Sequence, residues 1–355
     1  MECHSLLVER FKGLHVTVIG DVLLDTFVEC SARKLCSEGP VPVVWRGPEV
    51  AAPGGAANVA ANLAGLGARV RLVGVTGRDA AGELLRARLV ELGVGTTALL
   101  ARRVCQTHHK MRILADGHYV VRVDEGDTDR RDGGLWAAVQ ESLVGADAVV
   151  LSDYGLGVLH EWLIGRLARV MPDVPVVVDA KRPRRFRRLR PTAVTPNLEE
   201  ATALAGAAVP PDRLARRVRR ATAAQLVALT MGCQGAYLLD GSGRGEMLPA
   251  RPGPAESVVG AGDSFAAALA LGLAAQAPAS VAAAVAVETA GIAVAKRYTA
   301  VVTAPELRRS LAPAVATGDG DPRARPALAE LLPTLERPHL VAHRPEAEGP
   351  ATAAS

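Results

Sequence analysis

The sequence predicts an α/β protein with a doubly wound, mostly parallel sheet flanked by helices. Short and almost entirely apolar runs recur along the chain, as expected for strands that are buried on both faces of a parallel sheet. Stretches of helical composition separate several of these runs, and this alternation is typical of a doubly wound sheet. Two further segments break the alternation and predict a small additional β-sheet.

The expected elements follow one another along the chain. The first strand is HVTVIGD at 15–21, a run that ends in glycine and aspartate. Similar runs are RVRLVGVTG at 69–77, ADAVVLSDYG at 146–155, PVVVDA at 175–180, TAVTPN at 192–197 and LVALTMG at 226–232. Helices are expected at about 55–66, 80–92, 160–171, 198–206 and 212–223. They lie in intervals where parallel strands need a crossover connection.

Two segments, 26–52 and 104–124, contain strand-forming residues and turn residues without the helical stretches. Ala115-Asp116-Gly117 has the composition of a hairpin turn. We expect the two segments to pair into a small β lid beside the main sheet. Residues 1–312 are expected to form one domain, and 313–355, rich in Pro, Ala, Arg and Glu, to be largely disordered.

Composition and charge argue against several classes of protein. The net charge of +4 is mild and does not by itself favour nucleic-acid binding. The five cysteines include no CxxC pair, so a zinc site is not expected and reduced thiols are. The only near case of a membrane span, 265–287, is expected to be two buried helices broken near Pro278. Because the N-terminus has no apolar run of signal length, a cytoplasmic location is expected.

The sharpest feature is the run SVVGAGDSFAAALALGLAAQ at 257–276. Gly260, Ala261 and Gly262 have small or no side chains, so their backbone N–H groups can approach a phosphate closely. The apolar helix that follows presents its positive dipole end to the same place. Asp263 at the helix start could accept a proton from an attacking hydroxyl, as phosphoryl transfer requires.

A plain alternative is that GAGD is a turn in which Asp263 caps a buried helix. The chain has no GxxxxGK[ST], which disfavours a P-loop enzyme, and no H-R-D or D-F-G set, which excludes a protein kinase.

Two other motifs are consistent with sugar binding. In PGGAAN at 53–58, expected as a loop before a helix, Gly54 and Gly55 let the backbone approach a ligand and Asn58 can donate and accept hydrogen bonds. Asp25 follows the first strand, where α/β sheets bind ligands, and a carboxylate there suits a pair of sugar hydroxyls. The alternative for Asp25 is a helix or turn cap.

The run TPNLEE at 195–200 follows another strand. Asn197 and Glu200 lie three residues apart on one side of a helix start, where they could hold hydrated Mg²⁺ beside a nucleotide. A capping role is the simpler interpretation of this pair taken alone.

Six motifs, taken in their order along the chain, resemble the PfkB/ribokinase family of carbohydrate kinases. They are VIGDVLLD, PGGAANVAANLAGLGA, LSDYG, TPNLEEA, LTMGCQGAYLLD and VVGAGDSFAAALALG. The resemblance covers about 16–311 and implies a ribokinase-like fold, ATP and Mg²⁺ as cofactors, and a homodimer formed through the lid.

Five segments resemble one branch of this family, the bacterial D-glycero-β-D-manno-heptose-7-phosphate kinases. They are EGPVPVV, QTHHKMRILADGHYVVRVDEGD, LSDYGLGVL, VDAKRPRRFRRLRPTAVTPNLEEA and AGIAVAKRYTAVVTAPELRRSL. That branch transfers the γ-phosphate of ATP to the anomeric hydroxyl of heptose 7-phosphate. In some bacteria it is fused to a nucleotidyltransferase, for which 312–355 is too short, so the kinase alone is expected.

The resemblance assigns roles residue by residue. Asp263 matches the catalytic base, and the Gly260–Gly262 segment matches the anion hole. The remaining matches are Asp25, Gly54, Gly55 and Asn58 for the sugar, and Asn197, Glu200, Thr230 and Gly232 for the nucleotide, with Mg²⁺ held by Glu200 through water.

Lys110, Arg112 and Lys181 are candidates for the phosphate that the substrate already carries, because a second anion needs cations near the lid. For Lys110 and Arg112 the alternative is a solvated position on a lid strand.

The chain also departs from the family pattern. Ser257 and Val259 stand where the family has Asp-x-Thr before GAGD, and that aspartate often helps to bind a monovalent cation. K⁺ is therefore kept as a candidate activator whose usual ligand is missing. Val287 stands where an asparagine is common at the adenine wall, so the nucleotide pocket is expected to differ in detail.

Other functions remain as alternatives. A PfkB kinase for another sugar, sugar phosphate or nucleoside would differ in the pocket around the three cations. A catalytically silent sugar- or nucleotide-binding protein is disfavoured because Asp263 and the GAG loop are retained. The run 181–190 has seven basic residues in ten but one aromatic residue and no nucleic-acid module, so we favour a solvated loop that steers anionic substrates.

Overall fold

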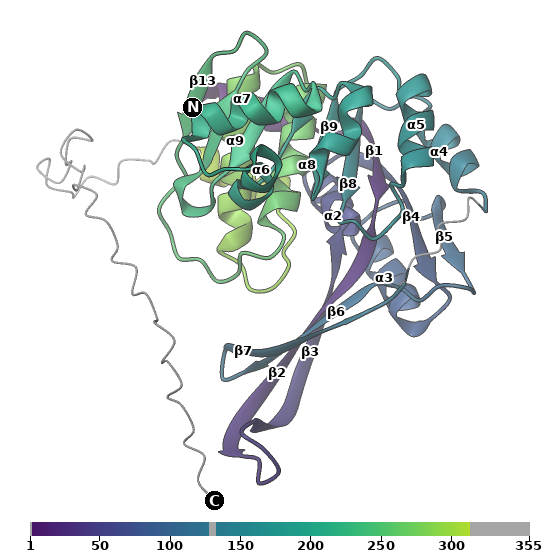
Figure 1. Ribbon diagram of the computed structural model, residues 1–355, viewed down its shortest axis with the longest axis vertical. Coiled ribbons are helices and arrows are strands. Elements are labelled where there is room, and N and C mark those ends of the chain that lie inside the picture. Colours follow the sequence, from purple (N-terminus) through teal and green to yellow (C-terminus); the bar gives the residue numbers. More distant parts are fainter. Residues whose placement is uncertain (1, 128–132, 313–355) are drawn as a thin grey trace, which may run out of the picture. The chain divides into compact units, whose positions relative to one another are not determined.

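The computed structural model describes residues 2–127 and 133–312, so the tail 313–355 expected to be disordered lies outside the described residues. The main sheet consists of β1 (His15–Gly20), β4 (Arg69–Gly77), β5 (Leu99–Arg102), β8 (Ala148–Asp153), β9 (Val176–Ala180), β10 (Ala193–Val194), β11 (Leu226–Thr230), β12 (Ala236–Leu239) and β13 (Gly245–Leu248). Their order in space is β13-β12-β11-β10-β9-β8-β1-β4-β5 (Figure 1). Neighbours from β5 to β11 pair in parallel, and only the β11-β12 and β12-β13 pairs of this sheet are antiparallel.

Helices cover both faces of this sheet. One face packs against α1 (Glu2–Glu9), α2 (Ala56–Gly65), α3 (Ala80–Glu91), α8 (Ala261–Ala274), α9 (Ala279–Val294) and α10 (Ala304–Leu311). The other face packs against α4 (Leu135–Leu143), α5 (Glu161–Val170), η1 (Pro183–Leu189), α6 (Leu198–Ala205) and α7 (Pro211–Thr222). Successive residues of a strand point to opposite faces of the sheet. Val150 packs in the hydrophobic core on the α8 face, and Leu151 packs in the core on the α7 face. This explains why the strands are apolar throughout.

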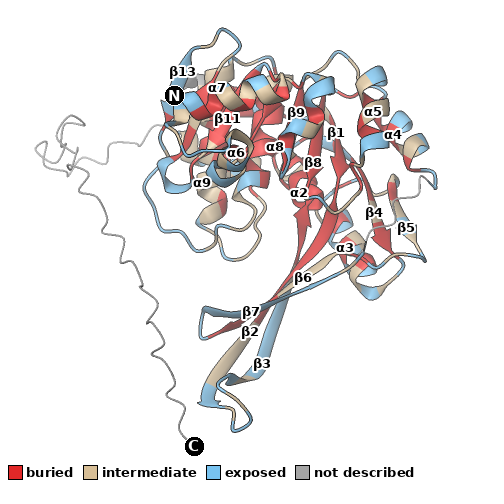
Figure 2. Cartoon of the chain, in the orientation of Figure 1, coloured by how far each residue is buried: buried red, intermediate tan, exposed pale blue. Residues whose placement is uncertain are grey.

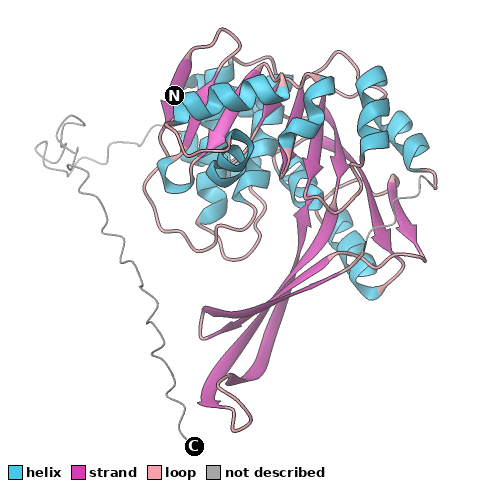
Figure 3. Cartoon of the chain, viewed as in Figure 1, coloured by secondary structure: helices cyan, strands magenta, loops and turns pink. Residues whose placement is uncertain are grey.

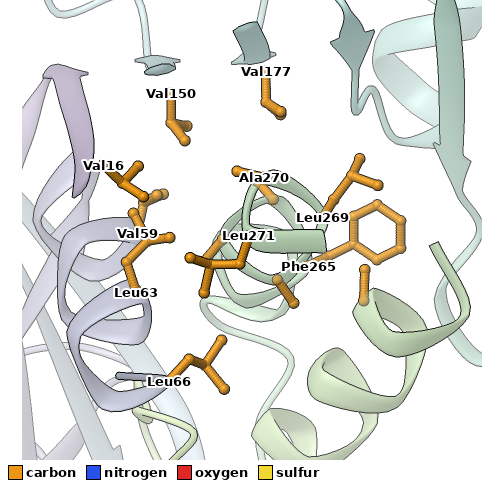
Figure 4. Close-up of a cluster of buried hydrophobic side chains, with 14 of the residues drawn as sticks. Val16, Val59, Leu63, Leu66, Val150, Val177, Phe265, Leu269, Ala270 and Leu271 are labelled. Atoms are coloured by element: carbon orange, nitrogen blue, oxygen red, sulfur yellow. The ribbon is translucent and has the colours of Figure 1, made fainter. Parts of the chain in front are cut away.

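The apolar helix α8 lies in the middle of the first core. Phe265, Leu269 and Leu271 pack among side chains of α2 and of the strands above them (Figure 4). A Cβ on Gly272 would lie 2.6 Å from Ala282 Cβ, so the small residue lets α8 and α9 approach closely. As expected, the two helices are separate, and Pro278 is the N-cap of α9. Among the described residues, no helix has the length and apolarity needed to span a membrane.

A second sheet projects from the main one (Figures 1 and 3). It contains β2 (Val22–Leu35), β3 (Pro42–Gly55), β6 (His109–Ala115) and β7 (His118–Glu125) in the order β3-β2-β6-β7, and is called the lid sheet below. The outer parts of β2 and β3 are half-buried or exposed, and β7 is exposed along its whole length (Figure 2). The turn between β6 and β7 places Asp116 and Gly117 at φ 49° and 82°, as a tight hairpin requires.

The predicted fold class is confirmed, with a few differences. Pro53, Gly54 and Gly55 were expected in a loop but are the last residues of β3, because they pair with Leu24, Leu23 and Val22 of β2. The structure also contains elements that were not predicted: helices α1, α4 and α10 and strands β5, β12 and β13. The run 181–190, expected as a solvated loop, contains η1, in which Phe186 is fully buried. The lid strands also begin closer to the main sheet than expected, so Asp25 is a residue of β2.

Candidate active site

The candidate site lies where the parallel strands end. Strand β1 is flanked by β4 and β8, so the chain winds outward from it in both directions, and ligands bind at the carboxyl ends of strands near such a point. A cavity of about 170 Å³ is found there. Its walls come from the ends of β8, β9 and β11 and the residues next to them, from Thr195 after β10, and from the starts of α6 and α8. Sequence motifs that lie far apart in the chain therefore meet in one place.

Asp263 is buried in the first turn of α8 and has both carboxylate oxygens engaged. Asn58 Nδ2 donates to Oδ2 and the Tyr154 hydroxyl donates to Oδ1, each at 2.8 Å. Burial raises the pKa of Asp263 to about 8, and the nearby Asp179 adds to the rise, whereas the two hydrogen bonds oppose it. A carboxyl group with this pKa can take up and release a proton near neutral pH.

The loop before Asp263 has the conformation that an anion hole needs. Gly260 is the N-cap of α8 with φ 83°, a left-handed conformation that favours glycine. A Cβ at Gly260 would also collide with Asn58 Nδ2, which holds Asp263. The first amides of α8 have no acceptor within the helix, and Gly260, Gly262 and Asp263 all line the cavity. The loop can therefore offer N–H groups to a phosphate beside the carboxylate.

Asp25 is buried on β2 and forms an ion pair with Arg112 of β6, so the pair links two strands of the lid sheet. The Arg112 guanidinium also lies 5.0 Å from the centre of the Phe27 ring. A Cβ on Gly54 would overlap the Asp25 carboxylate, which explains a glycine there. At Gly55, φ is 58° and a Cβ would come 2.6 Å from the Asp21 carbonyl oxygen.

Of the three candidates for the phosphate of the substrate, Lys110 and Arg112 lie on the lid sheet, whereas Lys181 follows a strand of the main sheet. Lys110 lies on β6 and pairs with Asp124 at 3.0 Å. Lys181 follows β9 of the main sheet, lines the cavity and pairs with Glu200 at 2.8 Å. Lys181 therefore lines the same cavity as Asn197, Glu200 and Thr230.

Asn197 and Glu200 form a capping box at the start of α6, the simpler of the two sequence interpretations. Asn197 Oδ1 accepts from the Glu200 amide at 2.8 Å, and Glu200 Oε2 accepts from the Asn197 amide at 3.0 Å. Both residues line the cavity, as does Thr230. Gly232, at φ 59°, begins the short helix η2 (Gly232–Gln234) and does not line the cavity.

A Mg²⁺ ion usually binds one or two protein carboxylates and otherwise water and substrate phosphates. The cavity carries Asp179 and Glu200, which suits such a hydrated ion. Glu200 Oε1 and Oε2 already accept hydrogen bonds, so contact through water fits better than direct ligation. Within 2–127 and 133–312, no group of three His, Cys, Asp or Glu side chains is placed to hold a metal.

Three residues of the site were not singled out from the sequence. Asp21 is buried after β1 and accepts from the backbone amides of Tyr154, Leu156 and Val158, each at 2.9 Å. Burial raises its pKa. Asp179 is half-buried on β9, one residue before its end, and burial followed by repulsion from Glu200 raises its pKa to about 6. The Tyr154 hydroxyl donates to Asp263 Oδ1.

A sequence signal for all three existed. Each stands where an apolar strand run ends: Gly-Asp at 20–21, Ser-Asp-Tyr-Gly at 152–155 and Val-Asp at 178–179.

Comparison with known proteins is consistent with this geometry. The profile of the pfkB family carbohydrate kinases matches residues 15–306. The bifunctional protein HldE of Azorhizobium caulinodans is 38% identical over 307 residues, which cover 83% of this chain and 64% of that protein. HldE of Pseudomonas aeruginosa PAO1 is 36% identical over 339 residues, covering 94% of this chain and 70% of that protein. The chain thus spans about two thirds of the length of these relatives.

Solved structures match the fold. Arabidopsis thaliana ribokinase complexed with ribose and ATP has a TM-score of 0.69 at 20% identity, over 84% of this chain and 98% of that one. Escherichia coli phosphofructokinase-2 in complex with potassium has a TM-score of 0.69 at 21% identity, over 84% of this chain and 97% of that one. The fold is therefore ribokinase-like, with a mostly parallel main sheet and a smaller lid sheet. Together with the family match over 15–306, this shows that the chain belongs to the PfkB family of carbohydrate kinases, phosphotransferases with an alcohol group as acceptor.

Proposed function

We propose that this chain transfers the γ-phosphate of ATP to the anomeric hydroxyl of D-glycero-D-manno-heptose 7-phosphate. The observation that carries the kinase chemistry is the Asp263 carboxyl group. It is buried, bonded through both oxygens, and located beside the Gly260–Gly262 loop in a cavity that the nucleotide-side residues also line. A base and an anion hole at one helix start are what transfer of a phosphoryl group to a hydroxyl requires.

In this proposal, Asp263 accepts the proton of the sugar hydroxyl as that oxygen attacks the γ-phosphorus, and the bond from the γ-phosphorus to the bridging oxygen breaks so that ADP leaves. Asn58 and Tyr154 keep the carboxylate oriented. The amides of Gly260, Ala261 and Gly262 stabilise negative charge that develops on the transferred group. Because the pKa of Asp263 is about 8, the group is a stronger base than an exposed aspartate and is still partly ionised at neutral pH.

The nucleotide would lie against Asn197, Glu200, Thr230 and Gly232, with Lys181 close to its phosphates. The Lys181 ammonium, held by Glu200, supplies positive charge in this part of the cavity. A Mg²⁺ ion bound through water to Glu200 would screen the charge of the ATP phosphates.

The sugar would lie on the other side of Asp263, near Asp25, Gly54, Gly55 and Asn58. Asp25 can accept hydrogen bonds from sugar hydroxyls through Oδ2, because its ion pair with Arg112 is made through Oδ1. Thr299 Oγ1 lies 3.4 Å from Oδ2 and can exchange this contact for one with substrate. We propose that Lys110 and Arg112 attract the phosphate that the sugar already carries.

The choice of heptose 7-phosphate is supported by the segments that resemble the heptose-phosphate branch, and by 36–38% identity to bifunctional HldE proteins. A second candidate is a PfkB kinase for an unphosphorylated sugar. It is favoured by one observation: Lys110 and Arg112 already have carboxylate partners, Asp124 and Asp25, so neither is an isolated cation that awaits a phosphate.

A substrate panel separates these candidates. ADP release would be measured with ATP and Mg²⁺, with and without K⁺, on heptose 7-phosphate, sedoheptulose 7-phosphate, fructose 6-phosphate, ribose and adenosine. We expect the highest kcat/KM with heptose 7-phosphate. A higher kcat/KM with ribose or adenosine would reject the phosphorylated substrate and support the second candidate.

Two further proposals concern organisation. The kinase domain would comprise residues 1–312, since the family match at 15–306 lies within them. The chain would form a homodimer through the lid sheet, whose exposed side chains include Trp45, Val50, Tyr119, Val121 and Val123.

A further inference from the structure

We infer that Tyr154 is a positioning residue whose hydroxyl holds the Asp263 carboxylate in the orientation that receives the proton of the sugar hydroxyl. This inference rests on the proposed function and names a residue that acts through the base. Tyr154 donates to Asp263 Oδ1 at 2.8 Å, and Asn58 donates to Oδ2 at the same distance. Two donors on two oxygens leave the carboxylate little freedom to rotate, so its remaining lone pairs point in fixed directions.

The backbone of Tyr154 is fixed in turn by the buried carboxylate of Asp21. Asp21 Oδ2 accepts from the amides of Tyr154 and Leu156, and Oδ1 accepts from Val158. The loop after β8 is therefore tied to the end of β1, at the centre of the main sheet. This places the Tyr154 side chain on a rigid support, and precise positioning of a proton acceptor depends on such support.

The Tyr154 ring lies between the two proposed substrate sides. A Cβ on Gly55, on the sugar side, would be 3.4 Å from the ring. The Lys181 ammonium, on the nucleotide side, lies 5.6 Å from the ring centre. The Tyr154 hydroxyl donates to Asp263, the proposed proton acceptor. One side chain therefore lies beside the sugar side, the nucleotide side and the proton acceptor.

The Tyr154 hydroxyl also affects the pKa of Asp263. The charged groups that face Asp263 are Asp179 from β9 and Asp25 from β2, and both raise its pKa together with burial. The donors Asn58 from α2 and Tyr154 oppose this by stabilising the ionised form. Burial raises the pKa of Tyr154 well above its ordinary value, so its hydroxyl stays protonated and remains a donor over the whole working range of pH.

Tyr154→Phe is the appropriate test, because it removes the hydroxyl but keeps the ring that faces Gly55 and Lys181. Tyr237→Phe is the matched control, since Tyr237 lies on β12 outside the cavity lining. The expected result for Tyr154→Phe is a 10- to 100-fold lower kcat, the size of a lost hydrogen bond to a charged group, with KM for ATP changed less than twofold. The acid limb of the kcat profile should move to higher pH. Tyr237→Phe should match the wild type.

A kcat within threefold of wild type with an unmoved acid limb would overturn the inference. A change in KM for ATP alone would also overturn it, because it would place the hydroxyl in nucleotide binding.

A second measurement needs no substrate and therefore separates this inference from the proposed function. Carboxyl ¹³C signals of labelled aspartate would be titrated in wild type and in Tyr154→Phe, with Asp263→Asn used to assign the Asp263 signal. The midpoint of Asp263 should rise when the hydroxyl is removed. An unchanged midpoint would refute the inference even in a protein that phosphorylates every sugar tested. A raised midpoint supports it even if heptose 7-phosphate proves to be the wrong substrate.

Discussion

Replacing Asp263 by asparagine is expected to abolish most activity and to stabilise the fold at the same time. Asparagine has the same shape and can still accept from Asn58 and meet the Tyr154 hydroxyl, so the packing of α8 should be kept. It cannot take a proton from a hydroxyl. A general base contributes about 10²- to 10⁴-fold to rate, so kcat should fall by about 10³-fold.

The gain in stability follows from the cost of a buried carboxylate. The pKa of Asp263 is raised from 3.8 to about 8, chiefly by burial and then by Asp179. Between these values the folded protein keeps a proton that the unfolded chain has lost, so wild-type stability decreases as the pH rises through this window. At pH 7 the protein is 7 minus 3.8 pH units above the ordinary pKa of the carboxyl group. At about 1.36 kcal/mol per unit, the buried carboxyl group lowers the free energy of unfolding of the wild type by about 4 kcal/mol. Asparagine does not titrate and avoids this cost.

The free energy of unfolding would be measured by denaturant titration at pH 4, 5.5, 7 and 8, with Asp173→Asn as a control. Asp173 is exposed, so its replacement removes a negative charge without relieving burial. The advantage of Asp263→Asn over wild type should be near zero at pH 4 and grow toward pH 8. An advantage that is independent of pH, or a variant less stable than wild type at pH 7, would refute the argument. A kcat within tenfold of wild type would refute the role as base.

Three other changes test separate parts of the structure. Gly54→Ala should raise KM for the sugar at least tenfold with little change in KM for ATP, because the new Cβ displaces the Asp25 carboxylate. Steady-state kinetics measure both KM values, and equal changes in the two would contradict this prediction. Asp21→Asn should lower the free energy of unfolding by about 2 kcal/mol, since an amide group cannot accept all three backbone hydrogen bonds, and a variant as stable as wild type in urea titrations would count against this role. Val121→Glu on the exposed strand β7 should reduce the sedimentation mass from two chains to one, whereas a one-chain mass already in wild type at micromolar concentration would reject the lid dimer.

The central part of the fold could be predicted from the sequence because it is encoded locally. Strands buried on both faces must be apolar throughout, and this pattern indicated β1, β4, β8, β9 and β11. The short helices α1, α4 and α10 have no comparable signal, because they are only partly buried or follow segments of mixed composition. The antiparallel orientation of β12 and β13 has a local signal, because the connections 231–235 and 240–244 are rich in glycine and too short for a parallel crossover.

The site was predictable where one motif carries it and not where distant residues meet. The GAGD run contains both the base and the amides, so Asp263 could be proposed from sequence alone. The partners of Asp263 lie 205 and 109 residues away, at Asn58 and Tyr154. Likewise, Lys181 stands next to an arginine-rich run in the sequence, but the structure pairs it with Glu200 across the end of the sheet. Such pairings follow from the order of the strands, which composition does not determine.

The most direct test of the account is the position of the new phosphate on the product. Wild-type protein would be incubated with heptose 7-phosphate, ATP and Mg²⁺, and the mixture followed by ³¹P NMR. We predict a second sugar phosphate signal coupled to the anomeric proton, formed in step with ADP and about 10³-fold more slowly with Asp263→Asn. ADP formed together with inorganic phosphate alone, or an anomeric signal formed equally fast with Asp263→Asn, would contradict the claim that Asp263 activates a sugar hydroxyl for phosphorylation.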